Sequence, residues 1–193
     1  GKFEVLSLKG DNLPMIKEEF LGATAERNGM EVLAGLSRYR LEKVIEKWGD
    51  MIPYINYKAQ IDKIPETNQI LREVGVNPEN TSLVISTLLK WVQENIEFNG
   101  TRGLSFISKS SKATYDDRYG SNEDLAVLLM GMLKEAGIRV YPVLTRFYTN
   151  GKPVSSFPYP YQFDHILVVA EVGFEKYYLD PSVSFAEVNE PYW

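Results

Sequence analysis

The sequence contains no cysteine, and only one of its 193 residues is a histidine. The absence of cysteine excludes disulfide bonds, thiolate metal ligands and a cysteine nucleophile. A single imidazole cannot form a multi-histidine metal site, so we expect no metal and no other cofactor. No apolar run approaches the roughly 20 residues of a membrane-spanning helix, and no signal peptide is visible.

The residues that are present are typical of a folded globular protein. Hydrophobic residues make up 44% of the chain and charged residues 24%, which excludes general disorder. Lys and Arg number 21 against 26 Asp and Glu, for a net charge of −5, and this balance argues against a nucleic-acid partner. The length predicts one domain with a buried core.

The clearest periodicity predicts two helices. Apolar residues recur at spacings of three and four from Val84 to Ile96, which indicates an amphipathic helix from Asn77-Pro78 to about Glu97. The second helix is apolar over a wide arc, and we expect it to be central and buried. Ser121 and Asn122 are residue types favoured at the N-cap of a helix, and Asp124 can complete a capping box. An apolar stripe follows over 125–136, and Gly137 stands where a left-handed residue would end the helix.

The remaining segments predict strands and loops in an order typical of an α+β fold, with helices packed on an antiparallel sheet. Three apolar, β-branched runs in the last third predict strands. A serine- and glycine-containing stretch predicts a loop, and weaker patterns predict an early strand and two short helices. The expected strands are 30–41, 138–149, 165–172 and 174–179, the short helices 48–60 and 65–75, the turn 150–151, and the loops 99–119 and 152–162.

An aromatic and proline-rich run, Phe157-Pro-Tyr-Pro-Tyr161, lies in the last of these loops. Tyr and Pro present rigid apolar area at low entropic cost, as surfaces that bind peptides or sugars do. The run is therefore interpreted either as one wall of a ligand groove or as a loop packed on the sheet.

Two residues suited to acid–base chemistry stand at the ends of neighbouring strands. The only histidine, His165, begins one predicted strand, and Asp180 follows the next. A tight hairpin would place them side by side, where the carboxylate would fix the imidazole tautomer. A catalytic set built on such a pair also needs a nucleophile at the start of the buried helix, and this third member is missing.

Several motifs resemble those of bacterial transglutaminase-like proteins, which have a papain-type cysteine protease-like fold. Arg118-Tyr-Gly-Ser-Asn-Glu-Asp124 is similar to the family's nucleophile motif Arg-Tyr-Gly-Asp-Cys-Lys-Asp. Phe163-Asp-His-Ile166 resembles its Phe-Asn-His-Val motif, and Leu179-Asp-Pro181 resembles its Leu-Asp-Pro motif. Trp91-Val-Gln-Glu-Asn-Ile96 is similar to a helix of the family, and order and spacing agree over residues 80–183.

The departure from the family motif decides the expected function. The family's cysteine attacks an amide and transfers the acyl group to an amine or water, but Asn122 stands at its position. The resemblance therefore implies vestigial His165 and Asp180 in a pseudoenzyme that binds a peptide or cell-wall-like ligand, or acts as a scaffold. Two alternatives stay open: an active hydrolase using Ser121, His165 and Asp180, and a purely structural domain of an envelope protein.

The resemblance also predicts the organisation of the chain. Residues 46–193 would form the transglutaminase-like domain, and 1–45 a linker or the end of a preceding β-rich domain. Leu13-Pro-Met-Ile-Lys-Glu-Glu19 is similar to such a linker. The first residue is Gly1 rather than Met, so we expect a fragment of a longer protein with neighbouring domains as partners. The family implies a bacterial periplasmic or cell-surface location.

Overall fold

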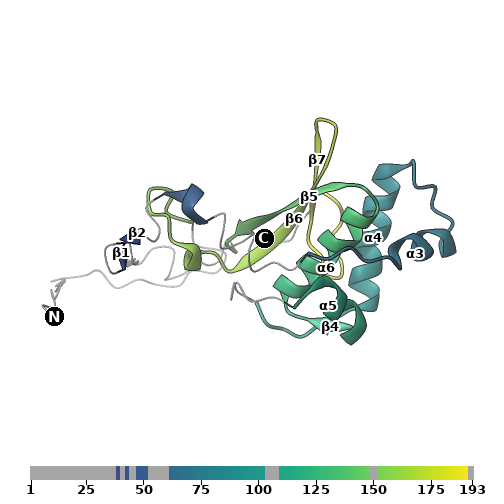
Figure 1. Ribbon diagram of the computed structural model, residues 1–193, viewed down its shortest axis with the longest axis horizontal. Helices are drawn as coiled ribbons and strands as arrows, with labels where there is room; N and C mark the ends of the chain where they lie inside the picture. Colours follow the sequence, from purple (N-terminus) through teal and green to yellow (C-terminus); the bar gives the residue numbers. More distant parts are fainter. Residues whose placement is uncertain are drawn as a thin grey trace, which may run out of the picture.

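The computed structural model describes residues 47–51, 61–102, 109–147 and 152–190, together with the backbone of 38–39 and 42–43. Helices pack beside a three-stranded antiparallel sheet (Figure 1), and the predicted α+β class is confirmed. The helices are α3 (Thr67–Glu73), α4 (Thr81–Asn95), α5 (Ser111–Asp117) and α6 (Asn122–Glu135), with short η1 (Trp48–Met51) and η3 (Pro160–Gln162).

The main sheet has the order β5-β6-β7, which are Arg139–Thr145, His165–Val172 and Glu175–Leu179. Each pair is antiparallel, and Gly173 lies between β6 and β7 with φ +61°. Two short pairings complete the described strands: β1 (Arg38–Tyr39) with β2 (Glu42–Lys43), antiparallel, and β3 (Glu97–Phe98) with β4 (Tyr119–Gly120), parallel. None of the helices in the described ranges is long and apolar enough to cross a bilayer.

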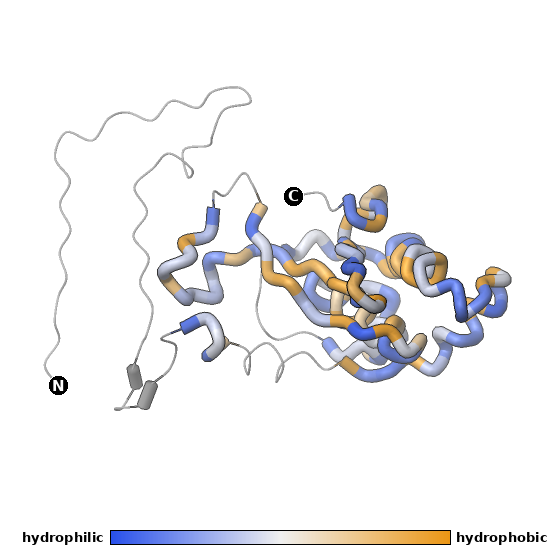
Figure 2. The backbone as a smooth tube through the Cα atoms, turned by 90° about the horizontal axis from the view of Figure 1, so that it is seen from above, coloured by the Kyte–Doolittle hydropathy of each residue, from blue (hydrophilic) through white to orange (hydrophobic). Residues whose placement is uncertain are grey.

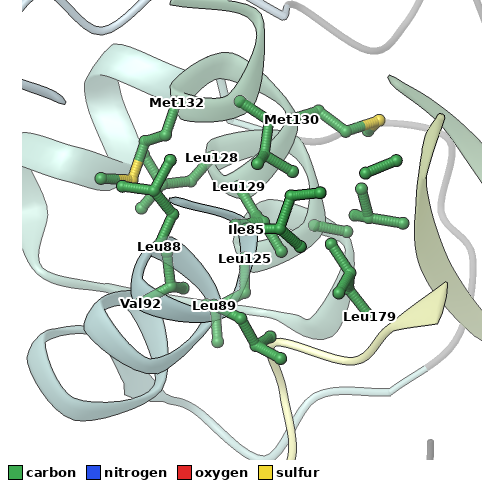
Figure 3. Packing of buried hydrophobic residues seen from close by; sticks show 14 of the residues in the cluster. Ile85, Leu88, Leu89, Val92, Leu125, Leu128, Leu129, Met130, Met132 and Leu179 are labelled. Carbon is green, nitrogen blue, oxygen red and sulfur yellow. The ribbon is translucent and has the colours of Figure 1, made fainter. Parts of the chain in front are cut away.

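Helix α6 is the centre of the hydrophobic core, as its wide apolar arc predicted. Every residue from Asn122 to Leu133 is buried, and Figure 2 shows long apolar stretches of backbone within the described part of the chain. The sheet contributes side chains from alternate positions of β6 and from the end of β7, because side chains alternate between the two faces of a strand. Residues that pack together here include Ile85, Leu88, Leu89 and Val92 of α4, Leu125, Leu128, Leu129, Met130 and Met132 of α6, and Leu179 of β7 (Figure 3).

The ends of α6 follow the predicted capping residues. The Asp124 backbone N–H donates to Ser121 Oγ at 3.2 Å, and the Ser121 N–H donates to Asp124 Oδ2 at 2.9 Å. This capping box satisfies two backbone donors that the first turn of a helix leaves without partners. At the other end Gly137 has φ +78°, the left-handed conformation that glycine adopts at low cost.

Glycine inside α6 permits a close approach by two other segments. A Cβ on Gly131 would lie 2.3 Å from the Asp62 backbone oxygen and 2.6 Å from Ser111 Oγ. Ser111 is fully buried and donates from Oγ to the Val127 backbone oxygen at 2.8 Å. The start of α5 is therefore joined to the middle of α6 by a buried hydrogen bond that only a glycine at position 131 leaves room for.

Two sequence predictions need correction. Helix α4 begins at Thr81 rather than at Asn77-Pro78, because the Asn80 side chain accepts the Leu83 N–H and is the N-cap. The predicted 99–119 loop contains helix α5, which the polar sequence hides. Ser110 caps it by accepting the Ala113 N–H, and its buried side of Ser111 and Thr114 lacks the apolar period that marks a helix.

The other element predictions fall into two groups. The helix at 65–75 and the strands at 138–149 and 174–179 are confirmed as α3, β5 and β7 with shorter bounds, and the strand at 165–172 is confirmed as β6 with the predicted bounds. The predicted helix at 48–60 is described only at η1. Of the predicted strand at 30–41, only Arg38–Tyr39 are described, as β1. The rest of that strand, the turn at 150–151 and most of the 1–45 segment lie outside the described residues, so the predicted domain boundary stays a prediction.

Candidate functional site

Three residues from separate segments meet in the interior and form what we call the polar triad: Asn122, His165 and Asp180. His165 Nε2 lies 2.8 Å from Asp180 Oδ2, and Asn122 Nδ2 lies 3.4 Å from His165 Nδ1. Each of the three residues is 0% exposed. The structure therefore brings together the helix tip, the imidazole and the carboxylate that sequence reasoning selected.

The register of the β6–β7 hairpin explains the contact between His165 and Asp180. Val168 pairs with Leu179, so His165 and Asp180 lie on the same face of the hairpin, offset by two residues. Such diagonal neighbours are within reach of long side chains. The imidazole therefore meets the carboxylate where β7 ends.

Asp180 has a complete set of hydrogen-bond donors. Its Oδ1 accepts the Ser182 backbone N–H at 3.1 Å and the Ser182 hydroxyl at 2.9 Å, while Oδ2 faces the imidazole. A buried polar group is costly unless it is hydrogen-bonded, and this carboxylate meets that condition. Ser182 is a member of the site that sequence reasoning missed.

The Asn122 side-chain amide makes fewer hydrogen bonds than the Asp180 carboxylate does. When His165 donates from Nε2 to Asp180, Nδ1 is an acceptor and the Asn122 NH₂ group is the matching donor. Asn122 Oδ1 is buried and has no hydrogen-bond partner among the described residues. The backbone N–H of Asn122 donates to the Thr101 carbonyl oxygen at 3.2 Å.

Ser121 is adjacent in sequence but has a different role in the structure. Its Oγ accepts the Asp124 N–H within the capping box, and no hydrogen bond joins it to His165 among the contacts of the described residues. Successive residues at the start of a helix point about 100° apart. The structure thus uses Ser121 as the N-cap of α6.

Gln93 of α4 is a second residue that sequence reasoning missed. Its Nε2 donates toward the backbone oxygens of Asp180, Val183 and Ala186 at 3.1, 2.8 and 3.0 Å. It lies four residues after Leu89, on the stripe of α4 that is otherwise apolar and buried. A glutamine on an apolar stripe was the sequence signal, and its partners follow β7 in the chain.

We expect Gln93→Ala to destabilise the fold by about 2 kcal/mol, because it leaves up to three carbonyl oxygens of the 180–186 segment without this donor. Urea unfolding measures the loss. Glu94→Ala is the matched control: Glu94 has an exposed side chain paired with Lys90 at 3.6 Å, an interaction worth at most about 0.5 kcal/mol. Equal effects of the two substitutions would contradict the positioning role of Gln93.

One aromatic ring contacts His165, and a guanidinium lies over that ring. The Phe147 ring lies 4.9 Å from the His165 ring, and the Arg102 guanidinium lies 5.0 Å from Phe147. In the first turn of α6, Asp124 Oδ1 accepts the Lys109 backbone N–H at 2.6 Å. The hydrogen bond to Asp117 raises the pKa of the Lys109 amine, so this cation remains charged beside the first turn of α6.

Two cavities border α4, and the first of them also borders Ser182, whose backbone N–H and hydroxyl donate to Asp180. One of about 450 Å³ is bordered by Gln93, Phe98, Arg118 and Ser182. The other, of about 440 Å³, lies between α4 and the 184–188 segment. Neither is lined by Asn122, His165 or Asp180, and in the described ranges no group of three His, Asp or Glu side chains could hold a metal ion.

Comparisons with known proteins find likenesses among solved structures but no match to a family model or a curated protein. No family model matches the chain, and no curated protein matches it. Its fold is similar to a proposed protease from Parabacteroides distasonis, with a TM-score of 0.49 and 14% identity over 67% of this chain and 26% of that one. It is also similar to a proposed cysteine protease from Cytophaga hutchinsonii, with a TM-score of 0.48 and 19% identity over 69% of this chain and 42% of that one.

The chain therefore spans less than half the length of either solved structure. Likenesses of this size do not bear on the reaction or the ligand of this protein.

Proposed function

We propose that this chain is a catalytically inactive, transglutaminase-like domain of the papain type that acts as a peptide- or glycopeptide-binding or scaffolding module. The observation that carries the proposal is the Asn122 amide, 3.4 Å from His165 Nδ1 at the position where a nucleophile would stand. A neutral amide cannot attack a carbonyl carbon as a thiolate does. Loss of the nucleophile from such a set removes on the order of a million-fold in turnover.

The backbone around Asn122 also supports inactivity. A developing oxyanion in acyl transfer is stabilised by backbone N–H groups aimed at it, often at a helix N-terminus. The Asn122 N–H is already bonded to the Thr101 carbonyl oxygen. A substrate carbonyl at this position would have to displace that oxygen.

The remaining triad is well suited to a structural role. It joins the first residue of α6 to the ends of β6 and β7, and all three side chains are excluded from solvent. A ligand of the module would thus contact the surface of the domain rather than the imidazole. Neighbouring domains of a longer chain are further partners in this proposal.

The Ser121 alternative has less support. Ser121 would have to leave the capping box and turn its hydroxyl toward His165, which costs the N-cap about 1 kcal/mol and rotates the start of α6. A fluorophosphonate probe provides a direct test. Labelling at Ser121 that is lost in His165→Ala would favour the hydrolase over the inactive module.

An acyl-transfer assay tests the main proposal. The purified chain is incubated with glutamine-containing casein and a fluorescent amine, and separately with a fluorogenic peptide amide. We expect turnover no higher than that of the His165→Ala variant. Turnover by the unaltered chain that His165→Ala abolishes would reject the inactive assignment.

A further inference from the structure

Arg118 borders the cavity of about 450 Å³, and its side chain lies over two aromatic rings. The guanidinium carbon is 4.2 Å from the centre of the Tyr115 ring and 5.0 Å from the centre of the Trp91 ring, and the two rings are stacked on each other. Stacking occupies the face of a guanidinium and leaves the N–H groups at its edge available. Trp91 belongs to α4 and Tyr115 to α5, so two helices orient this cation.

The backbone of Arg118 is held by hydrogen bonds to two elements. Arg118 ends α5 in the left-handed conformation, with φ 60°, which is uncommon for a residue other than glycine. Its N–H donates to the Thr114 carbonyl oxygen at 3.1 Å, and its carbonyl oxygen accepts the Glu97 N–H at 2.8 Å. A ligand would therefore meet a cation that is already ordered.

Arg118 has no ion pair among the described residues, although two carboxylates precede it in the sequence. Asp117 Oδ2 lies 2.8 Å from the Lys109 ammonium, and Asp116 pairs with Lys112. Both acids of α5 are thus neutralised by lysines rather than by the arginine. An ordered guanidinium with free edge donors is suited to a carboxylate, whose two oxygens match the two parallel N–H groups of the guanidinium.

The other side chains around the cavity restrict the rest of the ligand. Its charged residues besides Arg118 are Glu94, which is paired with a lysine at 3.6 Å, and Glu97, which is exposed and has no cationic partner in the described ranges. Ile96 and Leu125 in the lining are buried and apolar, and they favour an apolar group on the ligand. The cavity thus combines one unpaired cation, one unpaired carboxylate and an apolar surface.

We propose that this cavity binds a free α-amino acid with an apolar side chain. The carboxylate of the amino acid pairs with the edge of the Arg118 guanidinium, its ammonium group pairs with the Glu97 carboxylate, and its side chain packs against Ile96 and Leu125. A volume of about 450 Å³ is at the low end of small-molecule pockets, which span roughly 300–1,000 Å³. The cavity is not lined by the polar triad, so this inference goes beyond the proposed function and does not depend on it.

The two opposite charges of the lining favour a zwitterion over other charged ligands. A peptide carboxyl terminus would approach Glu97 with a charge of the same sign, and a phosphate would bring up to two such charges. A peptide amino terminus would in turn approach Arg118 as a second cation. An amino acid presents one charge of each sign and matches both residues.

An NMR titration of the chain with L-leucine tests the proposal. The Nε–H signal of Arg118, identified by its absence from the Arg118→Lys spectrum, follows binding directly, and we expect a Kd below about 1 mM. L-Leucinamide lacks the carboxylate and N-acetyl-L-leucine lacks the ammonium group. Each is expected to bind at least about tenfold more weakly, because each loses one charge-assisted interaction.

Arg118→Lys is expected to weaken L-leucine binding by about tenfold, because lysine keeps the charge but loses the planar fork and the stacking. Backbone amide signals give the affinity, and circular dichroism verifies that the variant is folded. Arg139→Lys is the matched control: Arg139 is an exposed arginine of β5 that pairs with Glu171 at 3.1 Å and does not line the cavity.

Three results would overturn the amino-acid assignment. The first is the absence of L-leucine binding at about 5 mM, several times the expected Kd. The second is an unchanged affinity in Arg118→Lys. The third is equal binding of N-acetyl-L-leucine, which would identify the occupant as a carboxylate without an ammonium group, such as a peptide carboxyl terminus.

Discussion

Asn122→Cys is expected to contain a thiol that ionises well below the usual range for cysteine. The side chain at position 122 is the first of a 14-residue helix and faces the imidazole of His165. A helix N-terminus and a neighbouring imidazolium both stabilise a thiolate. At pH 6 the thiolate fraction should exceed that of an ordinary thiol by on the order of a hundredfold.

Thiolate absorbance at 240 nm during a pH titration measures this effect without requiring a reagent to reach the buried site. The natural chain has no cysteine, so the introduced thiol is the only one that contributes. Ser121→Cys is the control, since its side chain would lie at the cap position rather than against the imidazole. An ordinary titration curve in Asn122→Cys would contradict a triad that is still arranged for nucleophile activation.

Asp180→Ala is expected to lower the free energy of unfolding by about 3–5 kcal/mol. The carboxylate accepts from Ser182 N, Ser182 Oγ and the imidazole, all inside a fully buried site. Removing it leaves these donors without an acceptor and opens a cavity beside His165. Such a loss is a large part of the stability of a domain of this size.

Urea unfolding followed by circular dichroism measures the change, and an unaltered m-value confirms that the same surface is exposed. Asp180→Asn is the matched variant: it preserves the volume and one acceptor, so we expect a smaller loss of about 1–2 kcal/mol. A loss below about 1 kcal/mol in Asp180→Ala would contradict the structural role of the triad.

The comparison of sequence and structure shows which signals are local. The capping residues Ser121, Asp124 and Gly137 act within one or two turns of α6, and the structure retains each of them. The Gly173 turn likewise joins two strands that the residue types of the sequence predict. Such features are predictable because neighbours in the chain satisfy each other's backbone groups.

Polar residues that bond across the fold were harder to predict. The sequence predicts a loop where helix α5 forms, because the buried side of this helix contains Ser111 and Thr114. Ser111 donates to the backbone oxygen of Val127, sixteen residues later in the chain. Gln93 stands out in the sequence as a polar residue on an apolar stripe, but its acceptors lie about ninety residues away and no local pattern identifies them. A periodicity argument assumes that buried positions are apolar, and these residues are not.

The amino-acid sequence by itself determined the α+β class, the central helix α6, the antiparallel strands β6 and β7, and the absence of a thiol nucleophile. These properties depend on residue type and on spacing along the chain. Only the tertiary structure decided that Asn122 reaches His165, that the Asn122 N–H is bonded to Thr101, and that the Trp48 indole donates to Ser155 of the aromatic loop. Those contacts depend on how the helices pack against the sheet, which is set by the sum of many burial interactions rather than by any local pattern.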